Sequence, residues 1–408
     1  MMFSLALPLV TVAIGKLAGA IPAPEGLQAR ASDAPIASSA FSVDMSATAM
    51  PSSSFLPPAP TFASMAPAPG PSGGVGLNVT PIYEPMSDFD YQTMLLGLHQ
   101  EFIELDLFHY GLMQFSQQDF AEAGITPEDM FLIEYMADQE VGHATMFIDM
   151  IEAAGAVATK PCNYSYPIGS VYEFLDFCQK ITRLGESGTY GFLPHLNSQP
   201  SASLIAQAVT IEARQQLIFR QFEGLFPMPE WFVPSLTQSM QWTLLAPFIT
   251  SCPAGSPHLE WQPFPALHIQ NNPNASLVCG TSNSSAAAIS TNCTALSAPG
   301  MMLNLTWDSP GQNVGPNNSY TTNTTAGSPA YVAWISQLNT TYTPLTNISG
   351  NAGLTQQPGG EIFGTGTAPL VNGTMFVLVT DSDPYVTPYN LSQLNPHVVA
   401  GPAIYQAG

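Results

Sequence analysis

The sequence predicts a mainly α protein, an antiparallel four-helix bundle followed by an irregular, partly β C-terminal region. Apolar residues recur at helical spacing between residues 86 and 250. Capping residues divide this stretch into long segments joined by short polar connections, which is typical of an up-and-down bundle. After Cys252 the composition shifts to Asn, Ser, Thr, Gly and Pro with brief β-type runs. With 408 residues, the chain is too long to be one bundle alone.

The N-terminal segment has the features of a secretory signal. An apolar run over residues 3–15 precedes Ala18-Gly19-Ala20, a small-residue pattern of the kind that signal peptidase cleaves. The run is too short to span a bilayer. We therefore expect a signal peptide over residues 1–20, secretion, and no membrane association after its removal.

The next segment, residues 21–80, is dominated by Pro, Ala, Ser and Gly and has almost no periodic apolar pattern. Such a composition cannot bury enough apolar surface to order itself. It predicts a disordered linker.

Each helix of the bundle can be placed by its capping signals. Thr126 as N-cap, Pro127 at the first helical position and Asp129 three residues after the cap start the second helix, which Gly155 ends. The same criteria place the first helix at 88–120, the third at 171–193, the fourth at 203–222, and a short fifth helix at 235–248. In the region that follows, residues 251–408, the runs 301–307 and 374–380 predict strands.

Charge excludes two classes of partner. The net charge is −22 with only seven Lys and Arg, so neither nucleic acid nor an anionic membrane surface would attract this chain. Residues 86–152 hold fourteen Asp and Glu and no Lys or Arg. Ion pairs cannot compensate those carboxylates locally.

Glycosylation signals agree with secretion. Twelve Asn-x-Ser/Thr sequons predict N-linked glycans, and they suit an extracellular protein in contact with cell-wall or matrix components; they begin at Asn78, Asn163, Asn274, Asn283, Asn292, Asn304, Asn317, Asn323, Asn339, Asn347, Asn372 and Asn390. Five cysteines without metal-finger spacing predict one or two disulfides. Cys178, inside an apolar helical pattern, is the expected free thiol.

Polar residues interrupt the apolar seam of two helices at matching places. In the second helix Glu140 and His143 lie mid-seam between apolar residues, and in the fourth helix Glu212 and Gln215 occupy the same positions. A buried carboxylate is costly unless a cation, a shared proton or water compensates it. Glu140-x-x-His143 places a carboxylate and an imidazole one turn apart, the spacing that dimetal carboxylate bundles use.

Further carboxylates could join this site. Glu101 lies near the centre of the apolar stripe of the first helix and Glu104 on its border, so either could contribute, and the third helix offers Glu186. The alternative is that these residues form hydrogen-bonded polar layers that set the register of the helices, or that they are solvated.

The four helices carry motifs that resemble the ferritin-like family. The similar segments are residues 100–108, 139–143, 184–191 and 211–215. The family includes plant desiccation-related proteins and, with a closer resemblance to this sequence, fungal secreted proteins linked to stress response and late sexual development. Residues 222–229, 242–247 and 395–402 resemble the fungal subgroup specifically. The resemblance implies a ferritin-like antiparallel four-helix bundle with an irregular, partly β C-terminal extension.

The resemblance also implies a metal site, with iron or manganese as the cofactor. Carried over by position, its ligands fall on Glu101 or Glu104, Glu140 with His143, Glu186, and Glu212 with Gln215. Gln215 stands where the family pattern has His, and an amide is a poor ligand for iron or manganese. One of the two metal positions is therefore in doubt.

Three functions follow from these features. The first is a metal-binding bundle, an oxidase or peroxide-handling protein. The second is a non-catalytic extracellular glycoprotein that uses a metal-free bundle as a scaffold. The third is a glycan- or matrix-binding module that would use exposed aromatic residues such as Trp307 and Trp334.

Overall fold

The described part of the chain comprises residues 86–274, 296–364 and 368–408 of a computed structural model. These residues belong to the compact unit Pro60–Gly408. The predicted signal peptide, the predicted linker and two cysteines, Cys279 and Cys293, lie outside the described residues.

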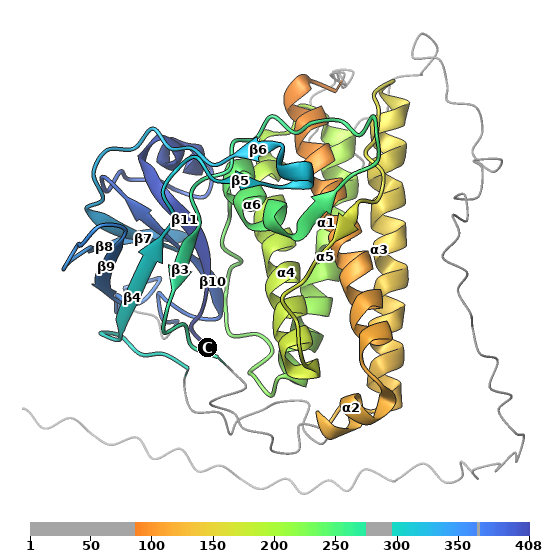
Figure 1. Ribbon diagram of the computed structural model, residues 1–408, viewed down its shortest axis with the longest axis horizontal. Helices are drawn as coiled ribbons and strands as arrows, with labels where there is room; N and C mark the ends of the chain where they lie inside the picture. The colour runs from red at the N-terminus through yellow and green to blue at the C-terminus, as the bar shows by residue number, and fades with distance from the viewer. Residues whose placement is uncertain (1–85, 275–295, 365–367) are drawn as a thin grey trace, which may run out of the picture. The chain divides into compact units, whose positions relative to one another are not determined.

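Four long helices lie side by side on one side of this unit (Figure 1). They are α1 (Asp88–Gln114), α3 (Pro127–Ala153), α4 (Val171–Phe192) and α5 (Gln199–Phe222). α1 packs mainly on α3 and α4 mainly on α5, and α1 also contacts α4. The predicted caps are confirmed at Thr126, whose capping box with Asp129 is complete, and at Ser170.

Three of the predicted helices have other bounds in the structure. The first helix ends at Gln114, and a separate short helix, α2 (Gln117–Glu122), follows with its own capping box between Ser116 and Asp119. Because Ser116 offers its side chain to the Asp119 amide, the chain restarts a helix there. The fourth helix begins at Gln199 with Ser198 as N-cap. The fifth helix, α6, is shorter than predicted and spans Gln238–Leu245.

The C-terminal region is more regular than the sequence analysis expected. A four-stranded antiparallel sheet has the order β11-β10-β7-β8, and a three-stranded sheet has the order β3-β4-β9. The strands are β3 (Leu267–Ile269), β4 (Met302–Trp307), β7 (Tyr331–Ser336), β8 (Asn339–Pro344), β9 (Ala352–Gln356), β10 (Thr374–Thr380) and β11 (Val398–Gln406). Two predicted strands, β4 and β10, are confirmed.

Smaller elements complete the fold. Two-stranded pairs join β1 (Asn163–Tyr164) to β2 (Ile249–Ser251) and β5 (Asn313–Val314) to β6 (Tyr320–Thr321). Single turns of 3₁₀ helix occupy Leu193–His195, Ala246–Phe248 and Pro316–Asn318, and a longer one, η6, spans Leu391–His397.

Strand β10 packs against the rest of the protein on both of its faces, and every one of its residues is buried. Phe376 and Leu378 belong to the core shared with the helices. Met375, Val377 and Val379 belong to a second core, which includes residues of the three-stranded sheet. The four-stranded sheet is therefore covered on both faces, by helices on one and by strands on the other.

The three described cysteines include one disulfide and the expected free thiol; the sequence analysis had left the pairing open. Cys162 and Cys252 form a disulfide, which links the segments that carry β1 and β2. Cys178 on α4 is a buried free thiol. Within the described ranges, no helix combines the length and the hydrophobicity that crossing a bilayer requires.

Candidate metal centre

Five ionisable side chains from three helices meet in the interior of the helical layer. Glu101 and Glu104 come from α1, Glu140 and His143 from α3, and Glu212 from α5. We call these five residues the acidic cluster. All four carboxylates are at most 3% exposed, and His143 is mostly buried. Ligand atoms of Glu101, His143 and Glu212 lie within 4.8 Å of one another, and so do those of Glu101, Glu104 and Glu140.

His143 is the cationic partner within this cluster. Its Nδ1 atom lies 3.1 Å from Glu140 Oε2, in hydrogen-bond geometry, and 3.3 Å from Glu101 Oε2, an ion-pair contact. Burial alone would lower the pKa of the imidazole, but the two adjacent carboxylates outweigh burial and raise that pKa to about 12. One positive charge thus faces four carboxyl groups.

Three carboxylates of the cluster each keep one oxygen that accepts no hydrogen bond. Within the described residues, the buried Oε2 atoms of Glu101, Glu104 and Glu212 accept no hydrogen bond. Burial raises the pKa of Glu101 to about 8, although His143 opposes the shift. Burial, and then the neighbouring carboxylates, raise the pKa of Glu104 and of Glu212 well above the ordinary glutamate value. A cation bound among these oxygens would relieve both the desolvation and the mutual repulsion.

Side-chain amides border the cluster on two sides, and the sequence analysis considered only one of them. Gln215 on α5 donates from Nε2 to Glu140 Oε1 at 2.5 Å, while its own Oε1 is buried without a partner. Gln100 on α1 donates to Glu104 Oε1 at 3.2 Å and to the carbonyl of Ile181 at 2.9 Å. Its spacing of four residues from Glu104 on one helix was the available signal.

Glu186 is not part of this cluster. Its Oε2 atom lies 3.1 Å from Arg183 Nη1, and Arg183 Nη2 lies 3.3 Å from Glu230 Oε1. Arg220 is also buried near Glu230 and donates to the carbonyl of Phe226 at 3.0 Å. We call Arg183, Glu186, Arg220 and Glu230 the arginine cluster. The structure thus places Glu186 in an ion pair and away from the other predicted ligands.

The α4 residue that faces the acidic cluster is Gly185. A Cβ atom at this position would lie 3.1 Å from Glu212 Oε2 and 3.1 Å from Gln100 Nε2. α4 therefore brings backbone close to the cluster where a side chain would crowd the carboxylate of Glu212.

The aromatic residues proposed for glycan binding are buried. Trp307 is 7% exposed and Trp334 is fully buried in the core between the two sheets. Trp307 lies on the buried side of β4, in which buried and less buried residues alternate, and Trp334 lies in β7, which is covered on both faces. The expectation that they are exposed was therefore wrong.

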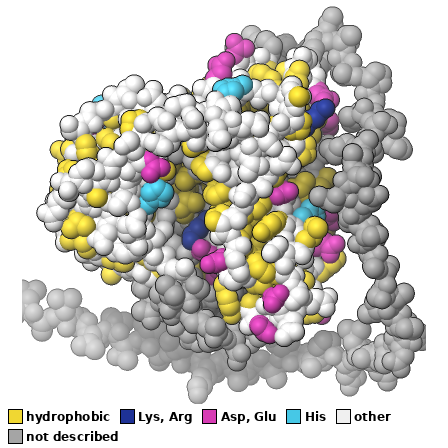
Figure 2. Space-filling view, in the orientation of Figure 1, with side chains coloured by type: hydrophobic (Ala, Val, Ile, Leu, Met, Phe, Trp, Pro, Cys, Tyr) yellow, Lys and Arg dark blue, Asp and Glu magenta, His cyan; other side chains and the backbone are white. Residues whose placement is uncertain are grey.

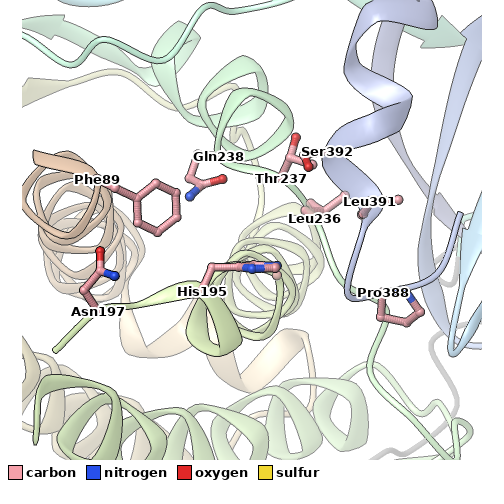
Figure 3. A pocket seen from close by; sticks show the side chains of 10 residues that line it. Phe89, His195, Asn197, Leu236, Thr237, Gln238, Pro388, Leu391 and Ser392 are labelled. Atoms are coloured by element: carbon pink, nitrogen blue, oxygen red, sulfur yellow. The ribbon is translucent and has the colours of Figure 1, made fainter. Parts of the chain in front are cut away.

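A cavity lies at the junction of α1, the turn after α4 and η6, apart from the acidic cluster (Figure 3). Its volume is about 240 Å³, and its lining includes Phe89, His195, Asn197, Gln238 and Leu391. No Asp, Glu, Lys or Arg and no residue of the acidic cluster lines it. This cavity offers one imidazole and no carboxylate, so the acidic cluster is the candidate metal centre.

Comparison with known proteins identifies the family of the helical region. The profile of the ferritin-like domain matches residues 87–225, which span α1 to the end of α5. Protein rds1 of Schizosaccharomyces pombe is 47% identical over 348 residues, which cover 83% of this chain and 86% of that protein. The chain therefore belongs to the family of fungal proteins with a ferritin-like domain that includes rds1.

Proposed function

We propose that this protein is a secreted ferritin-like metalloprotein whose acidic cluster binds a divalent cation, iron or manganese, inside an antiparallel four-helix bundle. The observation that carries the proposal is that four buried carboxyl groups face one imidazole, and that the Oε2 atoms of Glu101, Glu104 and Glu212 accept no hydrogen bond among the described residues. Neither α1 nor α3 contains a Lys or Arg that could compensate them.

The donor set suits this class of metal. Carboxylate oxygens favour manganese and magnesium, whereas an imidazole adds affinity for iron and zinc. Glu101, His143 and Glu212 come from three different helices and would hold the ion between them, with His143 releasing a proton on binding because only a neutral imidazole is a ligand. When bound, iron or manganese would supply Lewis-acid and redox chemistry at this position. The amides of Gln100 and Gln215 would orient Glu104 and Glu140 by donating to one oxygen of each.

Metal analysis tests the proposal directly. Protein purified from its natural secretion route and dialysed against metal-free buffer is loaded with manganese(II) or iron(II) and measured by elemental analysis. We expect stoichiometric binding in the natural protein and loss in Glu212→Gln, with Glu186→Gln as the matched control that keeps its metal. Less than about 0.1 ion per chain in the natural protein would favour the metal-free scaffold instead.

Several structural features support the extracellular part of the proposal. The Cys162–Cys252 disulfide suits an oxidising compartment. None of the sequon asparagines among the described residues is buried, and Asn163, Asn304, Asn317, Asn323 and Asn347 are exposed. On the face shown in Figure 2, the β region presents mostly uncharged side chains and backbone. A mass decrease of the secreted protein after treatment with an N-glycosidase is the expected result.

The biological setting is the part furthest from the structure. The resemblance to fungal stress-response and sexual-development proteins leads us to propose a role in one of these processes. Its test is the phenotype of a deletion strain complemented with the natural protein or with Glu212→Gln. Complementation by both would show that the role does not depend on the metal.

A further inference from the structure

We infer that the acidic cluster holds one divalent cation, bound by Glu101, His143 and Glu212, and that the Gln215 amide takes the place of the second ion of a dinuclear centre. This inference rests on the proposed metal-binding function and specifies it. The basis of the inference is a difference among the carboxylates of the cluster: some already accept a hydrogen bond from a side-chain amide and others do not.

A dinuclear carboxylate centre in a four-helix bundle needs a full set of ligands. Two helices each supply a Glu, and the other two each supply a Glu-x-x-His pair, so that each ion has its own imidazole. Here α3 supplies Glu140 and His143, but α5 supplies Glu212 and Gln215. The described cluster thus contains a single imidazole.

The two groups of ligand atoms in the cluster share Glu101 but differ in their neighbours. In the group of Glu101, Glu104 and Glu140, two of the three carboxylates already accept a hydrogen bond from an amide. An N–H group directed at a carboxylate oxygen presents positive charge where a cation would bind. A second ion at this position would have to displace the Gln215 donor from Glu140.

Glu140 is engaged on both of its oxygens. Oε1 accepts from Gln215 at 2.5 Å, and Oε2 accepts from His143 Nδ1 at 3.1 Å. Gln215 is held in turn by its contact with Gln139 Oε1 at 3.2 Å. Glu140 therefore acts as a positioning residue for His143 and Gln215 in this arrangement.

The other group is open. Glu101 Oε2 has the ion-pair contact with His143 Nδ1 at 3.3 Å, Glu212 Oε2 accepts no hydrogen bond, and neither carboxylate accepts an amide hydrogen in the described residues. On the α4 side, Gly185 brings no ligand, and a side chain there would meet Glu212 Oε2 at 3.1 Å. The missing ligands lie on the Gln215 and Gly185 side, so the ligand atoms of Glu101, His143 and Glu212, none of which faces a side-chain amide, define one position.

The test counts ions per chain. Full-length glycoprotein is stripped with a chelator, titrated with manganese(II) under anaerobic conditions, and measured by native mass spectrometry and by the electron paramagnetic resonance spectrum of the bound ion. We expect one manganese per chain and the six-line spectrum of an isolated ion. Two ions per chain with a coupled spectrum would overturn this inference and leave the proposed function intact, whereas zero ions would overturn the proposed function.

Two variants of Gln215 distinguish the effect of adding a metal ligand from the effect of removing the amide donor. In Gln215→His an imidazole replaces the amide, and we expect the stoichiometry to rise from one toward two. In Gln215→Leu, which loses the donor and gains no ligand, we expect it to stay at one. If Gln215→His remains at one ion while its circular dichroism matches that of the natural protein, the amide does not decide the stoichiometry and the inference fails.

Discussion

The acidic cluster and the arginine cluster both bury several carboxylates within the same helical layer, but they balance the charge differently. In the arginine cluster, Arg183 lies against both Glu186 and Glu230. There burial raises the pKa of Glu186 to about 7, with Arg183 opposing the shift. In the acidic cluster, four carboxylates share the single charge of His143. The two arginines of the arginine cluster match its two glutamates in charge, whereas one imidazole faces four carboxyl groups in the acidic cluster.

Removing the cation from the arginine cluster should have the largest effect on stability. Arg183→Met leaves Glu186 and Glu230 buried without their partner, and breaking a buried pair in this way costs about 3–5 kcal/mol. Urea denaturation of the two proteins measures the difference. A loss below about 1 kcal/mol would mean that the arginine cluster is not balanced by its ion pairs.

Adding metal should stabilise the protein through the acidic cluster alone. At a free concentration about 100 times the dissociation constant, a cation that binds only the folded state adds about 2.7 kcal/mol to the free energy of unfolding. Thermal denaturation with and without manganese(II) measures this gain. It should vanish in Glu212→Gln and persist in Glu186→Gln; equal gains in both variants would place the metal elsewhere.

The stability of the metal-free protein should fall as the pH rises from about 6.5 to about 8. Burial raises the pKa of Glu101 to about 8 in the folded protein, so the folded state holds a proton that the unfolded chain has released. Each such proton lowers the free energy of unfolding by about 1.4 kcal/mol per pH unit in this window.

Below pH 6.5 another group acts in the opposite direction. Burial lowers the pKa of His99 to about 4, so the unfolded chain binds the extra proton there and acid destabilises the fold. Denaturation of the natural protein and of Glu101→Gln in chelator at pH 6.5, 7.2 and 8.0 separates the contribution of Glu101 from that of Glu186, whose pKa burial raises to about 7. A slope that is unchanged in Glu101→Gln would assign the effect to other groups.

Neutralising one carboxylate should have the smallest effect on the free energy of unfolding, and the sign of that effect should differ between the two clusters. Glu104→Gln removes a group that repels Glu101 and Glu140, and we expect it to stabilise the metal-free protein by about 1 kcal/mol. Glu186→Gln weakens the pair with Arg183 and should destabilise by about 1 kcal/mol. Denaturation in chelator measures both, and equal signs would contradict the distinction between the clusters.

Local signals were sufficient to predict much of the helical layer. The capping residues Thr126 and Asp129, and the spacing of Glu140 and His143, depend on neighbours within one helix, and the structure confirms the caps. Glu212 could be added because α5 repeats the pattern of α3. The sequence thus predicted residues from three helices that the structure brings together.

The third-helix ligand could not be assigned in the same way. Glu186 is the acidic residue nearest the middle of α4, but the helix turns Gly185 toward the cluster and Glu186 toward Arg183. The spacing of three residues between Arg183 and Glu186 was a visible sign of the ion pair. Its second partner, Glu230, comes from the connection after α5, which a single helix pattern does not reveal.

The β region was underestimated for a related reason. Strand β7, which was not predicted, is buried along nearly its whole length and lacks the alternation of apolar and polar residues that identifies a half-buried strand. Strand β10 lacks it too and was predicted from its continuous apolar run. The prediction that Trp334 is exposed was wrong for the same reason, because its strand, β7, pairs with β10 inside the sheet.

The double burial of β10 has a consequence for anyone who wishes to produce the helical layer by itself. A recombinant fragment that stops near residue 250 would lack Phe376 and Leu378 and would leave their contact surface on the helices open to water. Exposed apolar surface of this kind promotes aggregation. The ferritin-like domain of this protein is therefore best purified with its β region attached, and proteolytic trimming is a poor route to crystals of the helices alone.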